Sequence, residues 1–241
     1  MVFCIFDIES SGLTIGSARI LEVGCCLYDD DIKEVFEKWS TLVSCVEYGN
    51  YDSVEANQAF AVNGINKILL ARHGMHPKDA FKIVNRYFDR SDYVIAHAGN
   101  NFDRPLLTFE AGQFGITISD KPWIDSKEDI EYGSKFYSRR LQHLAVDVGA
   151  NSNVCHRALE DCLTLSRVIP HFDMQSAIER SKSPIIRIEG EITFQETDKR
   201  EEAKKRRFMW DTEKKKWYKL IRQSDFGKEE SAVSFKIRRV S

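Results

Sequence analysis

Two carboxylates, Asp7 and Glu9, stand one residue apart at the end of an apolar run, Val2 to Phe6. A run of this kind is typical of a strand that is buried on both faces of a sheet. Side chains at positions i and i+2 of a strand point to the same side, so the two carboxylates converge on one spot. There they repel each other and are costly to desolvate, and a divalent cation such as Mg²⁺ or Mn²⁺ removes both penalties. The spacing alone also allows a simpler alternative, in which both side chains point to water.

The rest of the chain alternates between strand and helix patterns. Strands are predicted at residues 2–7, 18–30, 34–44, 92–99 and 121–126, and helices at 54–65, 67–74, 76–89, 101–115, 138–149 and 156–172. The early strands follow one another through short turns, which favours an antiparallel meander, whereas the later strands alternate with helices. We therefore expect an α/β fold with a mixed sheet and helices packed on it.

Further acids occur where such a fold would bring them to the first strand. Asp103 follows the strand predicted at 92–99, near the start of a helix, and Asp161 lies on the last long helix. His156 stands near the start of that same helix. If the strand at 92–99 neighbours the first strand, Asp103 faces Asp7, and the last helix supplies Asp161 and His156.

The number of acids indicates the chemistry. Four carboxylates exceed the needs of one Mg²⁺ but suit two ions about 3.5–4 Å apart, which hold the attacking and leaving oxygens of a phosphodiester. His156 is the candidate general base for an attacking water, because imidazole titrates near neutral pH. The alternative for His156 is a helix-capping or surface histidine. A nucleophilic pair of Cys155 and His156 is disfavoured, because adjacent residues rarely point at each other and no orienting motif surrounds them.

The order of these motifs resembles that of the DEDDh (DnaQ-like) family of 3′→5′ exonucleases, in the RNase H-like superfamily. The stretch FDIESSGL (6–13) is similar to the family's xDxETTGL, and RILEVGCCLYD (19–29) resembles its second strand. VNGI (62–65) resembles the family's xxHGI loop, and residues 141–165 resemble its final pair of helices. The likeness runs from residue 1 to about residue 172.

The resemblance implies a fold and a set of roles. The family has a five-stranded mixed sheet in the order 3-2-1-4-5, flanked by helices. His156 would activate water against the terminal phosphodiester. The ligands of two Mg²⁺ or Mn²⁺ ions would be Asp7, Glu9, Asp103 and Asp161.

The resemblance also points to residues that contact the substrate. Ser10 and Leu13 correspond to positions that hold the terminal 3′ nucleotide, with Leu13 wedged against its base, and Asn63 and His97 are the further predicted substrate contacts. The chain departs from the family at some of these places: Ser10-Ser11 replaces Thr-Thr, Asn63 replaces the loop histidine, and HAGNNFD (97–103) has one residue more than the usual HNAxFD. These departures bear on substrate preference more than on catalysis.

The resulting prediction is a metal-dependent 3′→5′ exonuclease that hydrolyses terminal phosphodiester bonds of DNA, in single strands or at 3′ ends, and releases nucleoside 5′-monophosphates. One alternative is a 3′→5′ exoribonuclease. Another is an accessory subunit with a nuclease fold whose C-terminal module docks a partner; a complete set of acids and histidine argues against an inert scaffold.

The C-terminal quarter differs in charge from the rest of the chain. Residues 1–180 have 18 Lys and Arg against 26 Asp and Glu, a net charge of −8, whereas residues 181–241 have 17 against 11, a net charge of +6. We expect an exonuclease domain at 1–178, a linker at 179–184 and a basic α+β module at 185–241. Tryptophans between lysines suit stacking of unpaired bases over a cationic surface, although the tryptophans of so small a module also suit its core. The predicted nucleic-acid contacts are Lys205, Arg206, Trp210 and Trp217.

Composition excludes several other classes. No apolar run approaches the roughly 20 residues of a membrane span, and the first residues lack the basic region of a signal peptide. We therefore expect a cytoplasmic protein, or a nuclear one in a eukaryote, with DNA or RNA as its partner, no membrane association, and a monomeric or homodimeric state. The six cysteines form no CxxC pair, which favours reduced, buried thiols over disulfides or a zinc site.

Overall fold

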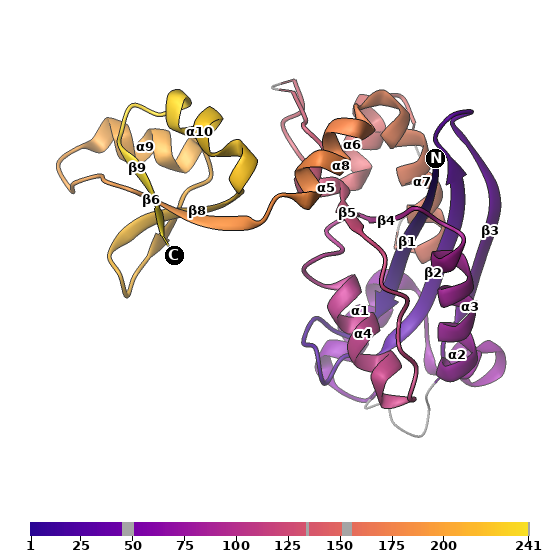
Figure 1. The fold of residues 1–241 in the computed structure, drawn as a ribbon. Coiled ribbons are helices and arrows are strands. Elements are labelled where there is room, and N and C mark those ends of the chain that lie inside the picture. Colours follow the sequence, from indigo (N-terminus) through magenta and orange to yellow (C-terminus); the bar gives the residue numbers. More distant parts are fainter. Residues whose placement is uncertain (45–50, 134, 151–155, 241) are drawn as a thin grey trace. The chain divides into compact units, whose positions relative to one another are not determined.

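The computed structural model describes residues 1–44, 51–133, 135–150 and 156–240. The chain divides into two compact units, Met1–Ala177 and Ile178–Ser241 (Figure 1). Most of the segment predicted as a linker, 179–184, is helical, because helix α8 (Met174–Lys182) runs into it.

The first unit is built on a five-stranded sheet. Its strands are β1 (Val2–Ser10), β2 (Ile20–Asp29), β3 (Glu34–Leu42), β4 (Tyr93–Ala96) and β5 (Trp123–Asp125). The order is β3-β2-β1-β4-β5, with antiparallel pairing from β3 to β1 and parallel pairing from β1 to β5. This confirms the predicted mixed sheet and its order, and it places β4 beside β1.

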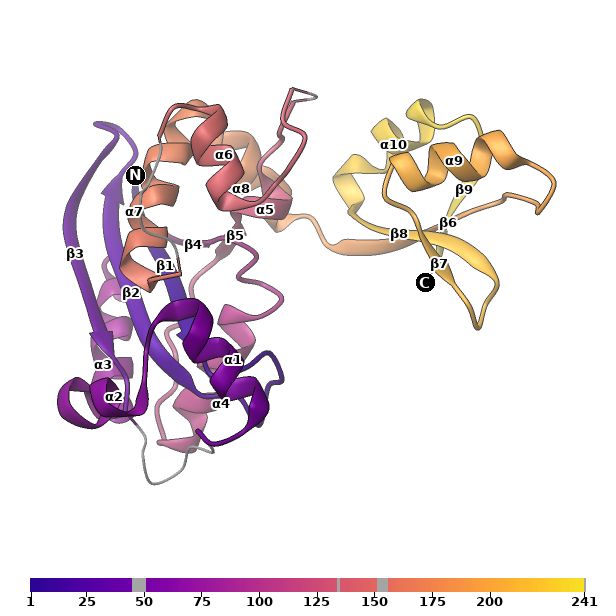
Figure 2. The ribbon, with the colours of Figure 1, turned by 180° about the vertical axis from the view of Figure 1, so that it is seen from behind.

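Helices cover both faces of this sheet (Figures 1 and 2). In chain order they are α1 (Val54–Asn63), α2 (Lys67–His73), α3 (Pro77–Asp89), α4 (Asp103–Gln113), α5 (Ser126–Asp129), α6 (Leu141–Asp147) and α7 (Ala158–Val168), and a 3₁₀ turn (Ile169–His171) leads to α8. α3 and α4 lie on one face, whereas α7 lies on the other and packs on β1 and β2.

Apolar side chains of β1 pack in the core between the sheet and α3. Phe6 of β1 is buried and makes edge-to-face contacts with Phe88 of α3 and Trp123 of β5, at centroid distances of 5.3 and 5.9 Å. Because side chains alternate along a strand, Phe6 and Ile8 belong to this core, while Asp7 and Glu9 point to the face that carries α7.

The second unit is a four-stranded antiparallel sheet with helices on one side of it (Figure 2). Its elements are β6 (Ile185–Gly190), α9 (Thr197–Lys205), β7 (Met209–Asp211), β8 (Lys216–Arg222), a 3₁₀ turn (Gln223–Asp225), α10 (Phe226–Ala232) and β9 (Ile237–Val240). The strand order is β7-β8-β6-β9, and Ile188, Phe208 and Phe235 are buried in the core. The fold is thus α+β.

Two simpler expectations concern thiols and membrane spans. Cys4, Cys25, Cys26 and Cys162 are free and buried, while Cys45 and Cys155 lie outside the described residues. Within the described part of the chain, every helix is too short or too polar to cross a membrane.

Candidate active site

β1 and α4 bring the first three acids together. Asp7 and Glu9 project from β1 toward α7, and Asp103 is the first residue of α4. The carboxylate of Asp103, only 6% exposed, accepts a hydrogen bond from the backbone N–H of Ile8, between the other two acids. This contact follows from the parallel pairing of β1 with β4, because the loop after β4 then leads back over the end of β1.

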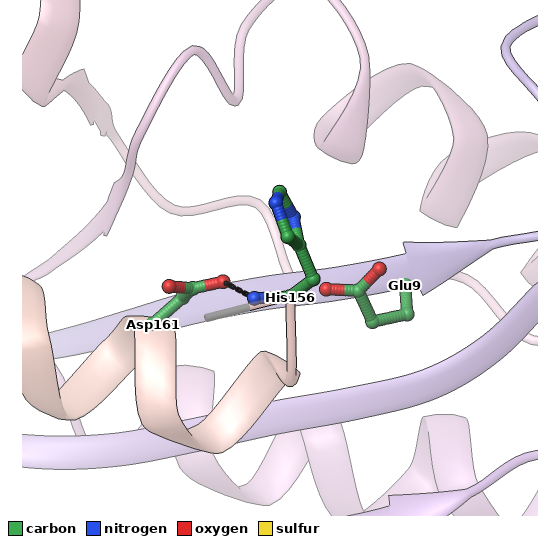
Figure 3. Close-up of side chains that lie close together, drawn as sticks. All are labelled: Glu9, His156 and Asp161. Carbon is green, nitrogen blue, oxygen red and sulfur yellow. Dashed lines mark hydrogen bonds between the residues drawn. The ribbon is translucent and has the colours of Figure 1, made fainter. Parts of the chain in front are cut away.

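α7 completes the cluster from the other side. One ligand atom from each of Glu9, His156 and Asp161 lies within 4.8 Å of the other two (Figure 3). The backbone N–H of His156 donates to the carboxylate of Asp161 at 3.0 Å, and the imidazole is exposed. His156 has a φ of 60°, which is uncommon for a residue other than glycine, so the chain turns sharply before α7 begins.

The electrostatics of the cluster follow from this crowding. Burial raises the pKa of Asp7 well above its usual range, and the neighbouring carboxylates of Asp103 and Asp161 raise it further. Burial, followed by repulsion from Asp161 and Glu22, raises the pKa of Glu9 to about 7. Burial also raises the pKa of Asp103 to about 7. Among the described residues, no ion pair includes Asp7, Glu9 or Asp103, and such a setting suits ligands for divalent metal ions.

A charged pair fixes the start of α7. Glu22 lies opposite Glu9 in the β1–β2 ladder and is 3% exposed. Both of its oxygens accept hydrogen bonds from the Arg157 guanidinium, at 2.9 and 2.7 Å, and one also accepts from the backbone N–H of Ala158 at 3.1 Å. Glu22 therefore caps α7 and holds the residue that follows His156.

A glycine sets the distance between β2 and α7. A Cβ at Gly24 would lie 2.5 Å from the carbonyl carbon of Ala158 and from the backbone nitrogen of Leu159. The first turn of α7 thus rests directly on the β2 backbone, and Cys162 on the same helix donates from its thiol to the Gly24 carbonyl at 3.4 Å. Asp161 reaches the cluster because the helix lies this close.

The loop between β4 and α4 is held by Asp125 of β5. This buried carboxylate accepts from the backbone N–H groups of Ala98, Asn100 and Lys127 at 3.0, 3.3 and 3.0 Å. Ala98 has a φ of 66°, in the left-handed region. The extra residue before Asp103 is accommodated by this turn, which returns the chain to the acids.

The predicted substrate residues have different surroundings. Leu13 is 85% exposed in the β1–β2 loop, whereas the half-buried Ser10 donates from its hydroxyl to the carbonyl of Gly12 at 2.7 Å. Asn63 is buried and hydrogen-bonds the carboxylate of Glu9, so it orients a member of the acidic cluster.

His97 is held by contacts within the protein. Its ring nitrogens lie 2.9 Å from the Ser126 hydroxyl and 2.9 Å from the Arg139 carbonyl oxygen, and burial lowers its pKa to about 4. The ring therefore connects the loop after β4 with the start of α5 and a residue shortly before α6, and its contact with substrate stays a prediction.

The residues predicted to contact nucleic acid in the second unit differ in their exposure. Lys205 is exposed at the end of α9, and Trp210 on β7 is about half exposed, with its ring 5.6 Å from that of Trp217. Trp217 packs against the core of the unit, and Arg206 pairs with Glu229 at 3.1 Å. Lys205 and Trp210 are therefore available at the surface, whereas Arg206 and Trp217 also have structural contacts, and all four nucleic-acid contacts stay predictions.

Sequence reasoning missed Gln142, whose side-chain amide donates to the carboxylate of Asp161 at 3.3 Å. No sequence signal identifies it, because a glutamine on an amphipathic helix is ordinary. Glu22 did carry a signal: it is the one charged residue in the buried stretch of β2 from Ile20 to Tyr28.

Comparison with known proteins identifies the fold of the first unit. No family model matches the chain. No curated protein matches it in sequence. A structure of Escherichia coli exonuclease I with zinc and single-stranded DNA superposes with a TM-score of 0.62 at 14% identity, over 74% of this chain and 42% of that one. Exonuclease X in complex with 5′-overhanging duplex DNA superposes with a TM-score of 0.54 at 18% identity, over 74% of this chain and 99% of that one.

The two comparisons differ in extent. This chain spans about two fifths of the exonuclease I chain but nearly all of the exonuclease X chain. At these identities the likeness shows the fold, which is the RNase H-like fold of the DEDDh exonucleases.

Proposed function

We propose that the protein is a metal-dependent 3′→5′ exonuclease that hydrolyses the terminal phosphodiester of DNA and releases nucleoside 5′-monophosphates. The observation that carries this proposal is the meeting of Asp7, Glu9, Asp103, His156 and Asp161 at the end of β1, in an RNase H-like fold. These residues come from three separate elements, and the crowding of their carboxylates has no structural benefit.

The carboxylate oxygens of Asp7, Glu9, Asp103 and Asp161 form a donor set that fits two Mg²⁺ or Mn²⁺ ions. Two such ions, when bound, would favour ionisation of a water and offset charge on the phosphodiester. The amides of the buried Asn63 and the half-buried Gln142 orient two of the carboxylates, and the Glu22–Arg157 pair holds the start of α7.

His156 is the proposed general base. Its imidazole is exposed beside Glu9 and Asp161, where it can accept a proton from a water that approaches the scissile phosphorus (Figure 3). Its backbone N–H is fixed by Asp161, so the ring can change rotamer while the main chain stays in place.

DNA is the proposed substrate. The superposed exonuclease I and exonuclease X structures contain single-stranded DNA and 5′-overhanging duplex DNA, respectively, which supports DNA over RNA. The exposed Leu13 is positioned in the loop next to β1 and would wedge against the base of the terminal nucleotide.

The test is cleavage of 5′-labelled single- and double-stranded DNA and RNA with Mg²⁺ or Mn²⁺, resolved on a denaturing gel. We expect stepwise shortening of DNA from the 3′ end and its loss in Asp7→Asn. This variant also removes a buried and crowded ionisable group, so it should melt no lower than the parent without metal, and should lose the stabilisation that Mn²⁺ gives the parent. Asp89→Asn, at an exposed helix end, is the matched control. Full cleavage by Asp7→Asn would refute the two-metal mechanism.

We further propose that the basic second unit contacts nucleic acid through Lys205 and Trp210. Both side chains are exposed, and a ring beside cations suits an unpaired strand. Lys205→Ala with Trp210→Ala should weaken binding of a long single strand and reduce its salt dependence. Unchanged binding would instead favour a docking role for this unit.

A further inference from the structure

The segment between Tyr132 and His143 departs from the acidic character of the first unit. It contains three Lys and Arg residues and no Asp or Glu, interleaved with three aromatic residues, in YGSKFYSRRLQH. Residues 1–180 as a whole carry a net charge of −8. Such a local excess of cations suits contact with a polyanion.

Aromatic contacts hold this segment against the body of the unit. The ring of Tyr132 packs edge-on against Phe172 at a centroid distance of 4.9 Å, and Phe136 packs against the same ring at 5.4 Å. The Tyr132 hydroxyl donates to the carbonyl oxygen of Ser126 at 2.8 Å. These contacts anchor the segment, so its exposed side chains project from a fixed position on the unit.

Tyr137 is the aromatic residue that this anchoring leaves outside. It is 74% exposed, and its ring lies over that of His143 at a centroid distance of 5.4 Å and an interplanar angle of 34°. The His143 ring thus supports the Tyr137 ring, most of whose surface is exposed to solvent. A supported, outward-facing ring is what stacks an unpaired base.

Two exposed cations, Lys135 and Arg140, stand two and three residues from Tyr137 in the sequence, and no carboxylate of the described residues forms an ion pair with either. The Lys135 ammonium lies over the Phe136 ring, 5.0 Å from its centroid, a contact that does not neutralise its charge. Arg139 differs, because it faces Glu128 at 3.5 Å and lies over the Tyr132 ring. Lys135 and Arg140 are therefore the cations of this segment that can pair with phosphates.

The segment adjoins the candidate active site through two contacts. The amide of Gln142, next to His143, donates to Asp161 at 3.3 Å. The carbonyl oxygen of Arg139 lies 2.9 Å from a ring nitrogen of His97, in the loop that leads to Asp103. The segment therefore adjoins the acidic cluster at Gln142 and the loop between β4 and α4 at Arg139.

We infer that residues 135–143 form a strand-binding rim beside the active site. A base close to the 3′ end of single-stranded DNA stacks on Tyr137, and Lys135 and Arg140 bind the phosphates on either side of it. The inference rests on the proposed exonuclease function, which directs a 3′ end to the acids; it adds a contact for the nucleotides that precede the terminal one.

Binding of a labelled 15-nucleotide DNA to the full-length protein tests the stacking contact. Fluorescence anisotropy is measured with Ca²⁺ in place of Mg²⁺, and a gel confirms that the DNA remains intact. Tyr137→Ala should raise Kd about tenfold, and Tyr137→Phe should restore tight binding, because stacking needs the ring and not the hydroxyl. Phe36→Ala is the control, since Phe36 is also exposed but lies on β3, at the opposite edge of the sheet.

The cations are tested by salt dependence. Each phosphate contact to a single strand contributes about 0.7 to the slope of log K against log salt, so Lys135→Ala with Arg140→Ala should reduce the slope by roughly 1.4. Lys38→Ala, an exposed lysine on β3, should leave the slope unchanged.

Position along the strand is tested by photocrosslinking. A 5-iodouracil near the 3′ end should crosslink to Tyr137, and one near the 5′ end should not. Any one of three results would refute the proposed strand-binding rim. These are parental affinity in Tyr137→Ala, an unchanged salt slope in the double variant, and crosslinks to Tyr137 that do not depend on the position of the 5-iodouracil. The failure of the exonuclease proposal is separate: it would appear as an absence of cleavage by the parent with Mg²⁺ or Mn²⁺.

Discussion

Substitution of Gly24 by alanine tests how the site is assembled without touching any acid. The added Cβ would lie 2.5 Å from the backbone of Ala158 and Leu159, whereas ordinary contacts begin near 3.4 Å. The obstructing atoms are backbone, so no side chain can rotate away. The first turn of α7 must therefore retreat from β2 by about 1 Å.

That retreat has two measurable consequences. Overpacking of this kind costs about 1–3 kcal/mol of the free energy of unfolding. α7 carries Asp161, and a displacement of about 1 Å in a catalytic constellation lowers the rate roughly 100-fold. Mn²⁺ should also bind more weakly, because one of its carboxylate ligands has moved.

The assays are urea denaturation, calorimetric titration with Mn²⁺, and single-turnover cleavage of a labelled oligonucleotide. Gly112→Ala is the matched control: Gly112 lies in α4, a Cβ there meets no atom within 4 Å, and alanine should stabilise the helix by about 0.5–1 kcal/mol. If Gly24→Ala retains the parental rate and Mn²⁺ affinity, the seating of α7 on this glycine does not position Asp161.

Three further predictions concern stability. Arg157→Ala should lower the free energy of unfolding more than Glu22→Gln, because it leaves a buried carboxylate unpaired. In a double-mutant cycle measured by urea denaturation, the two changes together should cost less free energy than the sum of their separate costs. Burial raises the pKa of Glu110 to about 7 from 4.5, so the unfolded chain releases this proton first, and the contribution of Glu110 to stability falls as pH rises between those values. Glu110→Gln should therefore be more stable relative to the parent at pH 8 than at pH 5; an equal difference at both would contradict this. Ala98→Gly should raise the melting temperature slightly, since φ is 66° there.

The parts of the fold that depend on local sequence patterns were predictable. The buried run before Asp7 identified β1, and the spacing of Asp7 and Glu9 identified a shared face. The complete sheet order came from the family resemblance, because no local pattern states that β4 pairs with β1. α8 and α10 were missed: α8 buries Met174, Ala177 and Ile178, but the serines and charges that follow indicated a linker, and α10 has only seven residues.

The site was predictable in its acids but not in their supports. Glu22 and Arg157 are 135 positions apart in sequence, and only the tertiary fold joins them. For His97, no local pattern predicts the contacts of its nitrogens with Ser126, at the start of α5, and Arg139, shortly before α6. Supporting contacts of this kind depend on which loops meet, and composition and spacing contain no information on that.

The crowded acids at the end of β1 also couple metal binding to protons. Burial raises the pKa of Asp7, Glu9 and Asp103, the last two to about 7, so these carboxyl groups retain protons near neutral pH when no cation is bound. A carboxylate must lose its proton to coordinate a metal ion. Under the proposed function, cation loading would therefore release protons and would strengthen as pH rises.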